Sequence, residues 1–569
     1  MATVVGIDLG TTNSLVAALD DGQPWVIPDA AGELLLPSVV GLTPEGQLLV
    51  GQAARRQYAA APERTVRSIK RQMGSDSTVT LGEQSFRPQE ISALILRTLK
   101  QRAEAALEDT VEQAVITVPA YFTDAQRQAT KEAGEIAGLE VLQILNEPTA
   151  AALVYDERGD DCQRLLVYDL GGGTFDVSIV EITGPVTEVM ASHGNNRLGG
   201  DDVDRLLQRL LVERFEEANG VTLPQDPSVE ARLLQAAERA KIELSEHCQV
   251  AVREAYLLSQ GDTPLHLDTV VQRHELEQLT RPLLRETLAA IDRALSDAGL
   301  RAGDLDRVIL VGGSTRMPLV QELVETHLPG IIVSSFEPDR CVALGAARQA
   351  AVLSGQVVDT VLVDVTPHSL GIATAIDMGI GLLSNIFSTI IPRNTVIPVS
   401  RSKLYMTSVD NQETVCIEVS QGEQVQADEN VPLGSFEVNG LPPKPAGKVK
   451  VEVQFSFDLN GILTVTALET TSGQREQLVV NNAAIQRRAS HELESSRSAV
   501  DSLFQSLVAA EMLGEDDGEA GDDGDEAEQD AVVDDLDVDD ELADPDLADG
   551  EDADEDDDDE GKVESGTTY

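Results

Sequence analysis

The sequence is short of cysteines, aromatic residues, positive charge and long apolar runs, and most of these shortages exclude a class of protein. Its four cysteines lie far apart and match no zinc-binding spacing, which favours reduced thiols in a cytoplasmic protein. No stretch approaches eighteen uninterrupted apolar residues, so no membrane span is predicted. The first residues have neither a basic segment nor an apolar core, so no signal peptide is predicted. The net charge of −57 argues against nucleic acid as a partner.

Acidic residues gather near the C-terminal end. From Glu515 to Glu560 the sequence has 28 acidic residues and no Lys or Arg. Such a segment buries too little surface to offset its ordering entropy, and its like charges repel, so residues 514–569 are predicted to be a disordered acidic tail. Its role stays open between a solvated tail, a solubility brush and a competitor at a basic client surface.

The length of 569 residues predicts two or three folded units. Residues 1–355 alternate short β-like runs with helical stretches, which is typical of an α/β domain. Within them, Thr123 and Gln126 form a predicted capping box for a helix over 124–138. Apolar residues at helical spacing predict a second helix over 229–246.

The sequence becomes almost purely β-like after an apolar, extended segment at 355–367. Alternate residues from Val449 to Phe457 are apolar, and Asn460-Gly461 supplies the turn of a tight hairpin. Residues 365–480 are therefore predicted to form an antiparallel β domain. One short helix is expected after it, with this apolar side: Leu493, Val500, Leu503, Phe504 and Leu507.

One acidic, glycine-rich turn occurs twice, as GIDLGTTNS (6–14) and YDLGGGTFDVS (168–178), each time between apolar runs. Backbone N–H groups in such turns bind anionic oxygens. Since a carboxylate would repel phosphate directly, Asp8 and Asp169 are better suited to holding a hydrated Mg²⁺, with Asp176 nearby. Two related half-domains would then close on one polyphosphate from both sides. The alternative is two unrelated glycine hairpins.

Other nucleotide-binding signatures fit less well. The sequence has no G-x-x-x-x-G-K-[ST] motif and no G-x-G-x-x-G between a strand and a helix. A third glycine element, VILVGGSTRMPLV (308–320), could let the backbone approach an adenosine, but strand–glycine–helix junctions are common.

Taken together, these segments resemble DnaK-type heat-shock chaperones of the seventy-kilodalton family. The nucleotide-binding domain is matched by GIDLGTTNS, VITVPAYFTDAQRQATKEAG, YDLGGGTFDVS, LGGDDVD, AAERAKIELS, VGGSTRMP and EPDRCVALGAA. The substrate domain is matched by TPHSLGI, IIPRNTVIP, DNQETVCIEVSQGE and DLNGILTV. The resemblance covers about 1–480 in order, and SNIFSTIIPRNTVIPVSR is most similar to the minor HscC-like branch.

The resemblance implies an α/β actin/hexokinase-type ATPase domain of four subdomains, followed by an antiparallel β-sandwich that binds peptides. The implied boundaries are 1–355 for the nucleotide domain, 356–364 for the linker, 365–480 for the sandwich, 481–513 for a short helical remnant of the lid and 514–569 for the tail.

The resemblance also implies roles for single residues around ATP or ADP, Mg²⁺ and K⁺. Lys70 would position the attacking water, and Glu147 would orient metal-bound water; Asp169 and Thr174 complete the catalytic set. The implied metal residues, mostly acting through water, are Asp8, Asp169 and Asp176. The implied nucleotide contacts are Gly10, Thr11, Thr12, Asn13, Gly171, Gly172, Gly173, Gly199, Gly200, Glu238, Lys241, Ser245, Gly312, Gly313, Ser314, Arg316 and Asp339.

The same resemblance implies a peptide pocket and a relay to it. The pocket residues are Ile372, Thr374, Tyr405, Val415 and Ile417, and the relay residues are Pro119, Arg127, Val361, Leu362 and Asp364. Purely structural roles stay open as alternatives to these functional roles. Lys70 could be a surface lysine, Glu147 a helix cap and Arg127 a solvated residue. Glu238 and Lys241 could be an exposed helix pair, and the pocket residues could form the core of the sandwich.

Several features depart from the family pattern. Only one short helix follows the sandwich, so fast peptide exchange is expected even with ADP. Gln143 stands where an arginine often engages the J-domain cochaperone, which weakens that partnership; a nucleotide-exchange factor is also implied. An ATP-dependent chaperone that binds extended apolar peptides is the preferred interpretation. The alternatives are a nucleotide-sensing regulatory protein with negligible turnover and an actin-fold sugar or acid kinase, in which the β domain would have no place.

Overall fold

The computed structural model describes residues 3–155, 162–335, 337–356, 361–377, 382–470, 475–479 and 490–514. The chain divides into two units, Met1–Gly514 and Glu515–Tyr569. The predicted acidic tail therefore lies, from residue 515 on, outside the described residues. None of the described helices combines the length and the apolar content needed to cross a lipid bilayer.

Two mixed sheets form the centre of the N-terminal part. The strands of the first are β1 (Thr3–Asp8), β2 (Asn13–Asp20), β3 (Gln23–Val26), β4 (Leu36–Pro37), β10 (Val111–Val118) and β11 (Glu140–Asn146). Those of the second are β12 (Gln163–Leu170), β13 (Phe175–Thr183), β14 (Val186–Asn195), β17 (Arg307–Val311), β18 (Ile332–Ser335), β19 (Val361–Val365) and β22 (Val396–Ile397).

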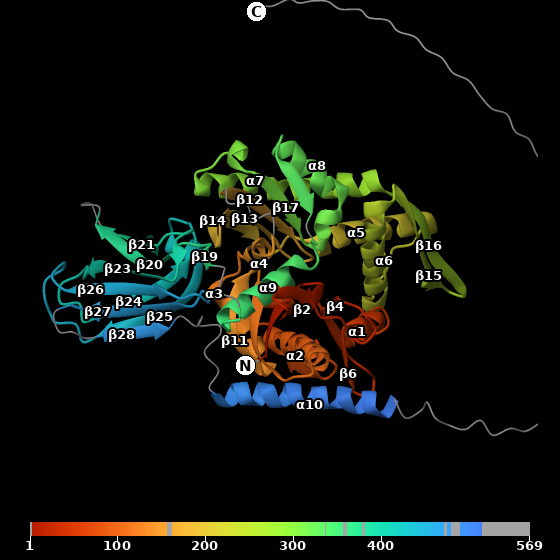
Figure 1. Ribbon diagram of the computed structural model, residues 1–569, viewed down its shortest axis with the longest axis horizontal. Helices are drawn as coiled ribbons and strands as arrows, with labels where there is room; N and C mark the ends of the chain where they lie inside the picture. The colour runs from red at the N-terminus through yellow and green to blue at the C-terminus, as the bar shows by residue number, and fades with distance from the viewer. Residues whose placement is uncertain are drawn as a thin grey trace, which may run out of the picture. The chain divides into compact units, whose positions relative to one another are not determined.

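The two sheets have the same strand order, which extends the sequence repeat to whole half-domains (Figure 1). The first runs β11-β10-β1-β2-β3, and the second runs β18-β17-β12-β13-β14 before β19 and β22 are added. In each sheet the first strand of an antiparallel hairpin, β1 of β1–β2 or β12 of β12–β13, pairs in parallel with the strand before it in the order, β10 or β17. The alternative of two unrelated glycine hairpins is therefore wrong.

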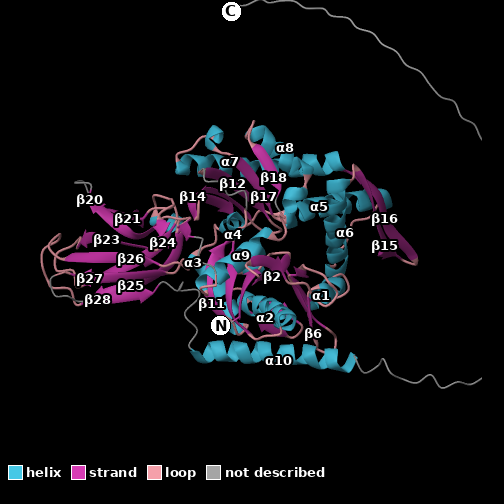
Figure 2. Ribbon diagram, viewed as in Figure 1, coloured by secondary structure: helices cyan, strands magenta, loops and turns pink. Residues whose placement is uncertain are grey.

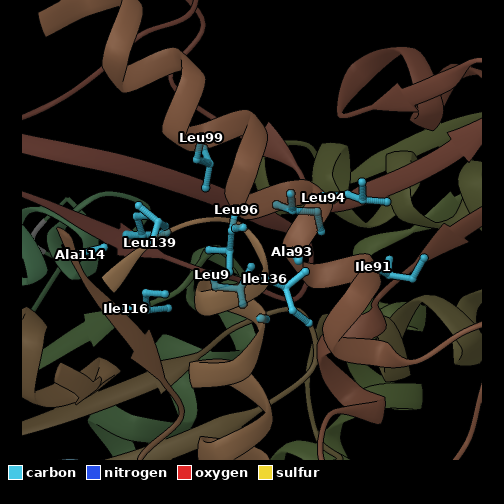
Figure 3. Close-up of a cluster of buried hydrophobic side chains, with 14 of the residues drawn as sticks. Leu9, Ile91, Ala93, Leu94, Leu96, Leu99, Ala114, Ile116, Ile136 and Leu139 are labelled. Carbon is cyan, nitrogen blue, oxygen red and sulfur yellow. The ribbon is translucent and has the colours of Figure 1, made fainter. Parts of the chain in front are cut away.

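Helices cover both sheets. They are α2 (Pro88–Leu107), α3 (Asp124–Ile136), α4 (Glu147–Leu153), α7 (Arg273–Ala298), α8 (Pro318–His327) and α9 (Cys341–Leu353). The predicted capping box at Thr123 and Gln126 is present at the start of α3. Leucine and isoleucine side chains of α2 and α3 pack on β10 in one buried core (Figure 3).

Helix α9 lies very close to both β1 and α4. A Cβ added at Gly6 would lie 2.0 Å from the Ala347 backbone nitrogen, and one at Gly345 would lie 1.8 Å from the Ala150 carbonyl oxygen. Only glycine fits at such backbone approaches, since any side chain would force the elements apart. These contacts bring the two half-domains together beneath the paired turns.

Each half-domain has further helices and strands outside its main sheet. On the first half they are α1 (Gln52–Gln57), β5 (Val39–Leu42), β6 (Leu48–Val50), β7 (Thr65–Arg67), β8 (Val79–Leu81) and β9 (Gln84–Phe86). On the second they are α5 (Gly200–Asn219), α6 (Pro227–Glu246), β15 (Gln249–Gln260) and β16 (Thr263–Gln272). The described 3₁₀ helices are η1 (Pro62–Arg64), η2 (Ile69–Gln72), η3 (Ala302–Asp304), η4 (Gly313–Arg316) and η5 (Ala427–Glu429). The helix predicted over 229–246 is confirmed as α6.

The C-terminal β part consists of two four-stranded sheets, and Figure 2 shows it built almost wholly of strands. One sheet holds β20 (Leu370–Asp377), β21 (Leu382–Ile391), β24 (Thr414–Gln421) and β25 (Val431–Asn439). The other holds β23 (Val399–Met406), β26 (Lys450–Phe457), β27 (Leu463–Glu469) and β28 (Arg475–Val479). The predicted hairpin at Asn460-Gly461 is confirmed, because β26 and β27 pair across it.

The predicted C-terminal helix is α10 (Ser490–Gly514), which packs on α2, α3 and β6. Val500 and Phe504 are buried in the core of the first half-domain, and Leu493 and Leu503 pack against it. Arg97 forms an ion pair with Asp501 and stacks on the Phe504 ring. The Leu507 side chain, predicted on the same face, lies outside the described residues.

Candidate functional site

The two glycine-rich turns face each other in direct contact. A Cβ at Gly172 would lie 1.9 Å from Thr12 Oγ1, and one at Gly173 would lie 2.6 Å from Thr11 Cγ2. Because a side chain at either glycine would collide with the opposite turn, both turns expose backbone groups where they meet. This arrangement is suited to binding an anion such as a phosphate chain.

Carboxylates lie at the base of the paired turns. Asp8 ends β1, and Asp169 in β12 stands directly opposite Asp176 in β13. Thr117 donates a hydrogen bond to Asp8 at 3.2 Å, and the Tyr121 N–H donates one to Asp176 at 3.0 Å. The sequence prediction that these three residues converge is thus consistent with their placement on neighbouring strand ends.

Burial raises the pKa of all three carboxyls. The pKa of Asp8 rises from 3.8 to about 7, first through burial and then through the nearby Glu147, and Lys70 partly offsets both effects. Burial and Glu147 also raise the pKa of Asp176 to about 7. The pKa of Asp169 is raised by burial, by Glu147 and by the other two aspartates. Crowded acids of this kind call for a cation.

Lys70 and Glu147 form a buried pair next to these acids. Lys70 is 3% exposed and Glu147 is 7% exposed, and the ammonium group contacts the Glu147 carboxylate. Lys70 also lies over the Phe122 ring at 5.8 Å. Lys70 is therefore no surface lysine, and Glu147, the first residue of α4, directs its carboxylate to Lys70.

The acids fit a hydrated divalent cation. Asp176 Oδ2 is buried and has no hydrogen-bond partner within the part of the chain that the structure describes. In the same part, no three acidic, His or Cys side chains converge closely enough to ligate a metal ion directly. The resemblance implies that Asp8, Asp169 and Asp176 would hold Mg²⁺ mainly through water, and the unpartnered oxygen of Asp176 leaves an acceptor for such a water.

The structure places the other implied nucleotide residues around these turns. Gly10 and Asn13 close the first turn, Thr174 is buried in the second, and the Ser314 hydroxyl donates to the Gly171 carbonyl at 2.9 Å. A Cβ at Gly199 would lie 2.6 Å from Gly172, and one at Gly200 would lie 2.6 Å from Ser314 Oγ.

The remaining residues of the implied set form local contacts. Ser245 donates to the Lys241 carbonyl within α6, and Arg316 pairs with Asp339 at 2.5 Å. Gly312 has a φ of 84°, and a Cβ at Gly313 would lie 3.4 Å from Asp339.

The alternative that Glu238 and Lys241 form an exposed helix pair is wrong. Glu238 is buried and pairs with Arg55 at 2.7 Å and Arg67 at 3.3 Å. Lys241 instead pairs with Asp204 at 2.8 Å. Sequence reasoning missed Arg55, Arg67 and Asp204, since their only signal was a set of charges on elements far apart in the chain.

A second network joins this site to β19. Arg127 is buried and donates to the Asn146 side chain at 2.6 Å and to the Ala120 carbonyl at 3.0 Å. Asn146 in turn donates to Asp364 at 2.9 Å and directly precedes Glu147. Arg127 is therefore no solvated residue.

Asp364 belongs to a strand and not to a free linker. Val361, Leu362 and the residue after them pair in parallel with β14. Pro119 accepts from the Phe122 N–H at 3.1 Å at the start of the turn that leads into α3. The predicted relay residues thus lie in one connected region.

The predicted peptide-pocket residues divide into two groups. Ile372 and Ile417 are buried in the sandwich core, which agrees with the alternative that they form that core. Tyr405 and Val415 are partly buried against it, and the Thr374 hydroxyl donates to the Ile386 carbonyl at 3.0 Å.

The β part contacts the N-terminal part through a histidine. The His368 ring lies against the Tyr121 ring with their centroids 4.2 Å apart, and one ring nitrogen lies 3.3 Å from the Tyr121 carbonyl oxygen. The pKa of His368 is lowered from 6.5 to about 4, mainly by burial; the hydrogen bond to Tyr121 acts in the other direction, and the charges of Arg127 and His193 add to the lowering. Nearby, Arg393 pairs with Asp297 at 2.7 Å.

We expect this contact to weaken in acid. Because the unfolded histidine binds a proton more readily, the stability that neutral His368 contributes is complete above pH 6.5 and is lost as the pH falls toward 4. Thermal unfolding between pH 7 and pH 5 should therefore show a smaller loss of stability in His368→Phe than in wild type. Equal losses in the two proteins would contradict this assignment. His274→Phe, altered on an exposed helix start, serves as the matched control.

A family of known proteins matches most of the chain. The family model described as Hsp70 protein matches residues 4–81 and 75–532. The match covers both half-domains with their paired turns, the β part and α10.

Proposed function

The chain belongs to the Hsp70 family, and on that premise we propose that Mg²⁺-dependent ATP hydrolysis between the paired turns controls how tightly the β-sandwich holds extended apolar peptides. Family membership assigns a chaperone role in general, an ATPase activity and the use of ATP or ADP with Mg²⁺. The segment SNIFSTIIPRNTVIPVSR further supports placement in the HscC-like branch.

The opposed turns and the buried Lys70–Glu147 pair carry this proposal. Hydrolysis adds water to the terminal phosphorus and releases ADP and inorganic phosphate, a reaction that depends on positioning and on charge stabilisation. Bound Mg²⁺ would offset negative charge on the phosphate oxygens. Lys70 places a fixed positive charge where charge builds up, and Glu147 holds it there.

The path from Glu147 to β19 supports coupling between the two activities. Glu147 and Asn146 are neighbours in the chain, so a shift of one moves the other. Asn146 bonds to Asp364, which belongs to the strand added beside β14. A change at the phosphate end can therefore favour or disfavour strand addition, which is the two-state element that coupling requires.

Partners follow from the same proposal. Clients would be unfolded or extended apolar segments held by backbone hydrogen bonds at the sandwich. A nucleotide-exchange factor would speed release of ADP. Gln143 has a neutral side chain, so it offers no charge to a J-domain. It is also buried and accepts a hydrogen bond from Gln349 at 2.8 Å.

The burial of Gln143 also favours a second candidate. A protein without cochaperone stimulation could act as a nucleotide-sensing regulator with negligible turnover. The buried acids and Lys70 then serve for nucleotide binding alone.

Steady-state ATP turnover separates the two candidates. We expect Mg²⁺-dependent phosphate production by the full chain and a several-fold increase with an extended apolar peptide, because typical coupling energies correspond to about 5–150-fold effects. A charged peptide of equal length is the control. Turnover that is absent, or unchanged by the apolar peptide, would leave only the sensor.

A further inference from the structure

A cavity of about 340 Å³ lies between the first and second half-domains and is lined by residues of both. This volume is in the range of small-molecule sites. The residues that line it are Tyr58, Arg67, Ser68, Arg71, Gln72, Arg197, Asp201, Arg205 and Leu234. We call it the arginine pocket.

The arginine pocket is positive within a strongly acidic chain. Four guanidinium groups face one carboxylate among its lining residues, although the chain carries a net charge of −57. Two carboxylates outside the lining offset part of this charge: Asp202 pairs with Arg71 at 2.9 Å and with Arg205 at 3.3 Å, and Glu238 pairs with Arg67 at 3.3 Å. Arg197 is exposed and forms no ion pair with any residue that the structure describes. The pocket therefore has positive charge to spare for an anion.

The pocket shares a wall with the phosphate-binding turn. A Cβ at Gly173 would lie 2.9 Å from Arg71 Cγ, so the Arg71 side chain packs directly on that glycine. Lys70 and Arg71 are consecutive, yet Lys70 pairs with Glu147 and Arg71 pairs with Asp202. The short helix η2 thus places the side chain of Lys70 in the candidate functional site and the side chain of Arg71 in the arginine pocket.

Arg71 is also incompletely satisfied. Its Nη1 atom is buried and has no hydrogen-bond partner in the described ranges, and it lies 3.9 Å from the Asp201 carboxylate, beyond hydrogen-bond distance. A buried guanidinium nitrogen without a partner is costly unless an anion completes it.

The arginines lead outward from the turn to solvent. The exposed fraction of the side chain rises from 13% for Arg71 and 17% for Arg67 to 54% for Arg205. A second cavity, of about 320 Å³, shares Tyr58, Arg205 and Leu234 with the first and continues the path.

We propose that the arginine pocket is the exit site for inorganic phosphate, which passes Arg71 and is held by Arg197 and Arg205 before it reaches solvent. The inference rests on the proposed ATP hydrolysis, which produces this anion at Gly173. Guanidinium groups bind phosphate through paired hydrogen bonds, and the fixed charges stabilise the anion after it leaves the turn. A phosphate dianion could also enter from solution, so the test separates the two sources.

The test is a single-turnover experiment on the full chain carrying Arg197→Gln and Arg205→Gln together. Acid quench measures ATP cleavage, and a fluorescent phosphate sensor measures release in the same reaction. We expect unchanged cleavage and release slowed by about tenfold, because charges of one sign lining a cleft raise the rate at which an oppositely charged ligand enters it by roughly 10–10³-fold, and entry into the pocket is the first step of the proposed exit. The charge-matched control is Arg253→Gln with Arg281→Gln, which alters one exposed and one half-buried arginine, both outside the pocket.

The outcomes distinguish the exit site from the proposed function. Normal cleavage with unchanged release would overturn the exit site alone. No cleavage by the wild-type chain would overturn the proposed function and the exit site with it. In a second arm, inorganic phosphate is titrated into protein loaded with a non-hydrolysable triphosphate. Weaker phosphate binding by the variant, without slower release, would show a site for anions from solution and would overturn the exit role.

Discussion

Replacement of Lys70 by alanine is expected to lower the rate of ATP cleavage by at least about 100-fold, the usual cost of removing one fixed group that stabilises a transition state. Lys70 is 3% exposed and contacts Glu147, so water cannot easily replace its charge. ATP should still bind, because the backbone of the paired turns is unchanged. Acid-quench cleavage assays and calorimetric ATP titration measure the two quantities.

Loss of Lys70 also leaves Glu147 without its partner, and breaking a buried ion pair typically costs about 3–5 kcal/mol. Lys70→Gln keeps a hydrogen-bond donor and serves as the second variant if the alanine protein does not fold. Lys100→Ala, which removes a lysine paired with Glu104 on α2, is the matched control. Cleavage by both Lys70 variants within twofold of wild type would refute the proposed role.

The second large effect is expected from Arg127→Ala, which should abolish the influence of ATP on peptide affinity. Arg127 is buried, and its pKa is lowered by burial although Asp364 acts in the other direction. Its removal breaks the hydrogen bond to Asn146 through which it reaches Asp364, and a hydrogen bond to a charged group is typically worth about 1.5–3 kcal/mol. That cost is comparable to a typical coupling energy of about 1–3 kcal/mol, so we expect β19 to be no longer held beside β14.

Fluorescence anisotropy of a labelled apolar peptide, with ATP and with ADP, measures this loss. The variant should bind the peptide equally in both nucleotides, whereas wild type should not. Lys131→Ala on the same helix is the control, since it lies one turn away and outside the network. A nucleotide-dependent difference in the Arg127 variant equal to that of wild type would contradict the relay.

Local patterns predicted much of the fold. The repeated turn indicated two related half-domains because glycine, threonine and aspartate have few other reasons to recur between apolar strands. The alternation from Val449 to Phe457 and the Asn460-Gly461 turn fixed a hairpin, since each depends on neighbouring residues only. The capping box at Thr123 is local for the same reason.

Contacts between distant elements could not be predicted from the chain alone. Arg55 and Arg67 reach Glu238 from elements more than 150 residues away, and no local pattern marks that approach. Glu238 and Lys241 are one turn apart, so spacing suggested a pair, but each found a better buried partner.

The alternation of apolar residues was ambiguous in the sandwich. Ile372 and Ile417 are buried in its core, whereas Tyr405 and Val415 are only partly buried. A strand pattern identifies the inward face but does not distinguish residues that fill the core from residues that line an opening in it.

The pairing of β19 with β14 has a consequence for the proposed coupling between the nucleotide site and the β part. Val361 stands opposite Val186, and the next two residues follow in strict register. A slip of one residue would turn the partly buried Leu362 to water and the exposed Val361 inward. Intermediate registers are therefore disfavoured, so under the proposed coupling this segment would be either fully paired with β14 or fully released, and the response would be all-or-none.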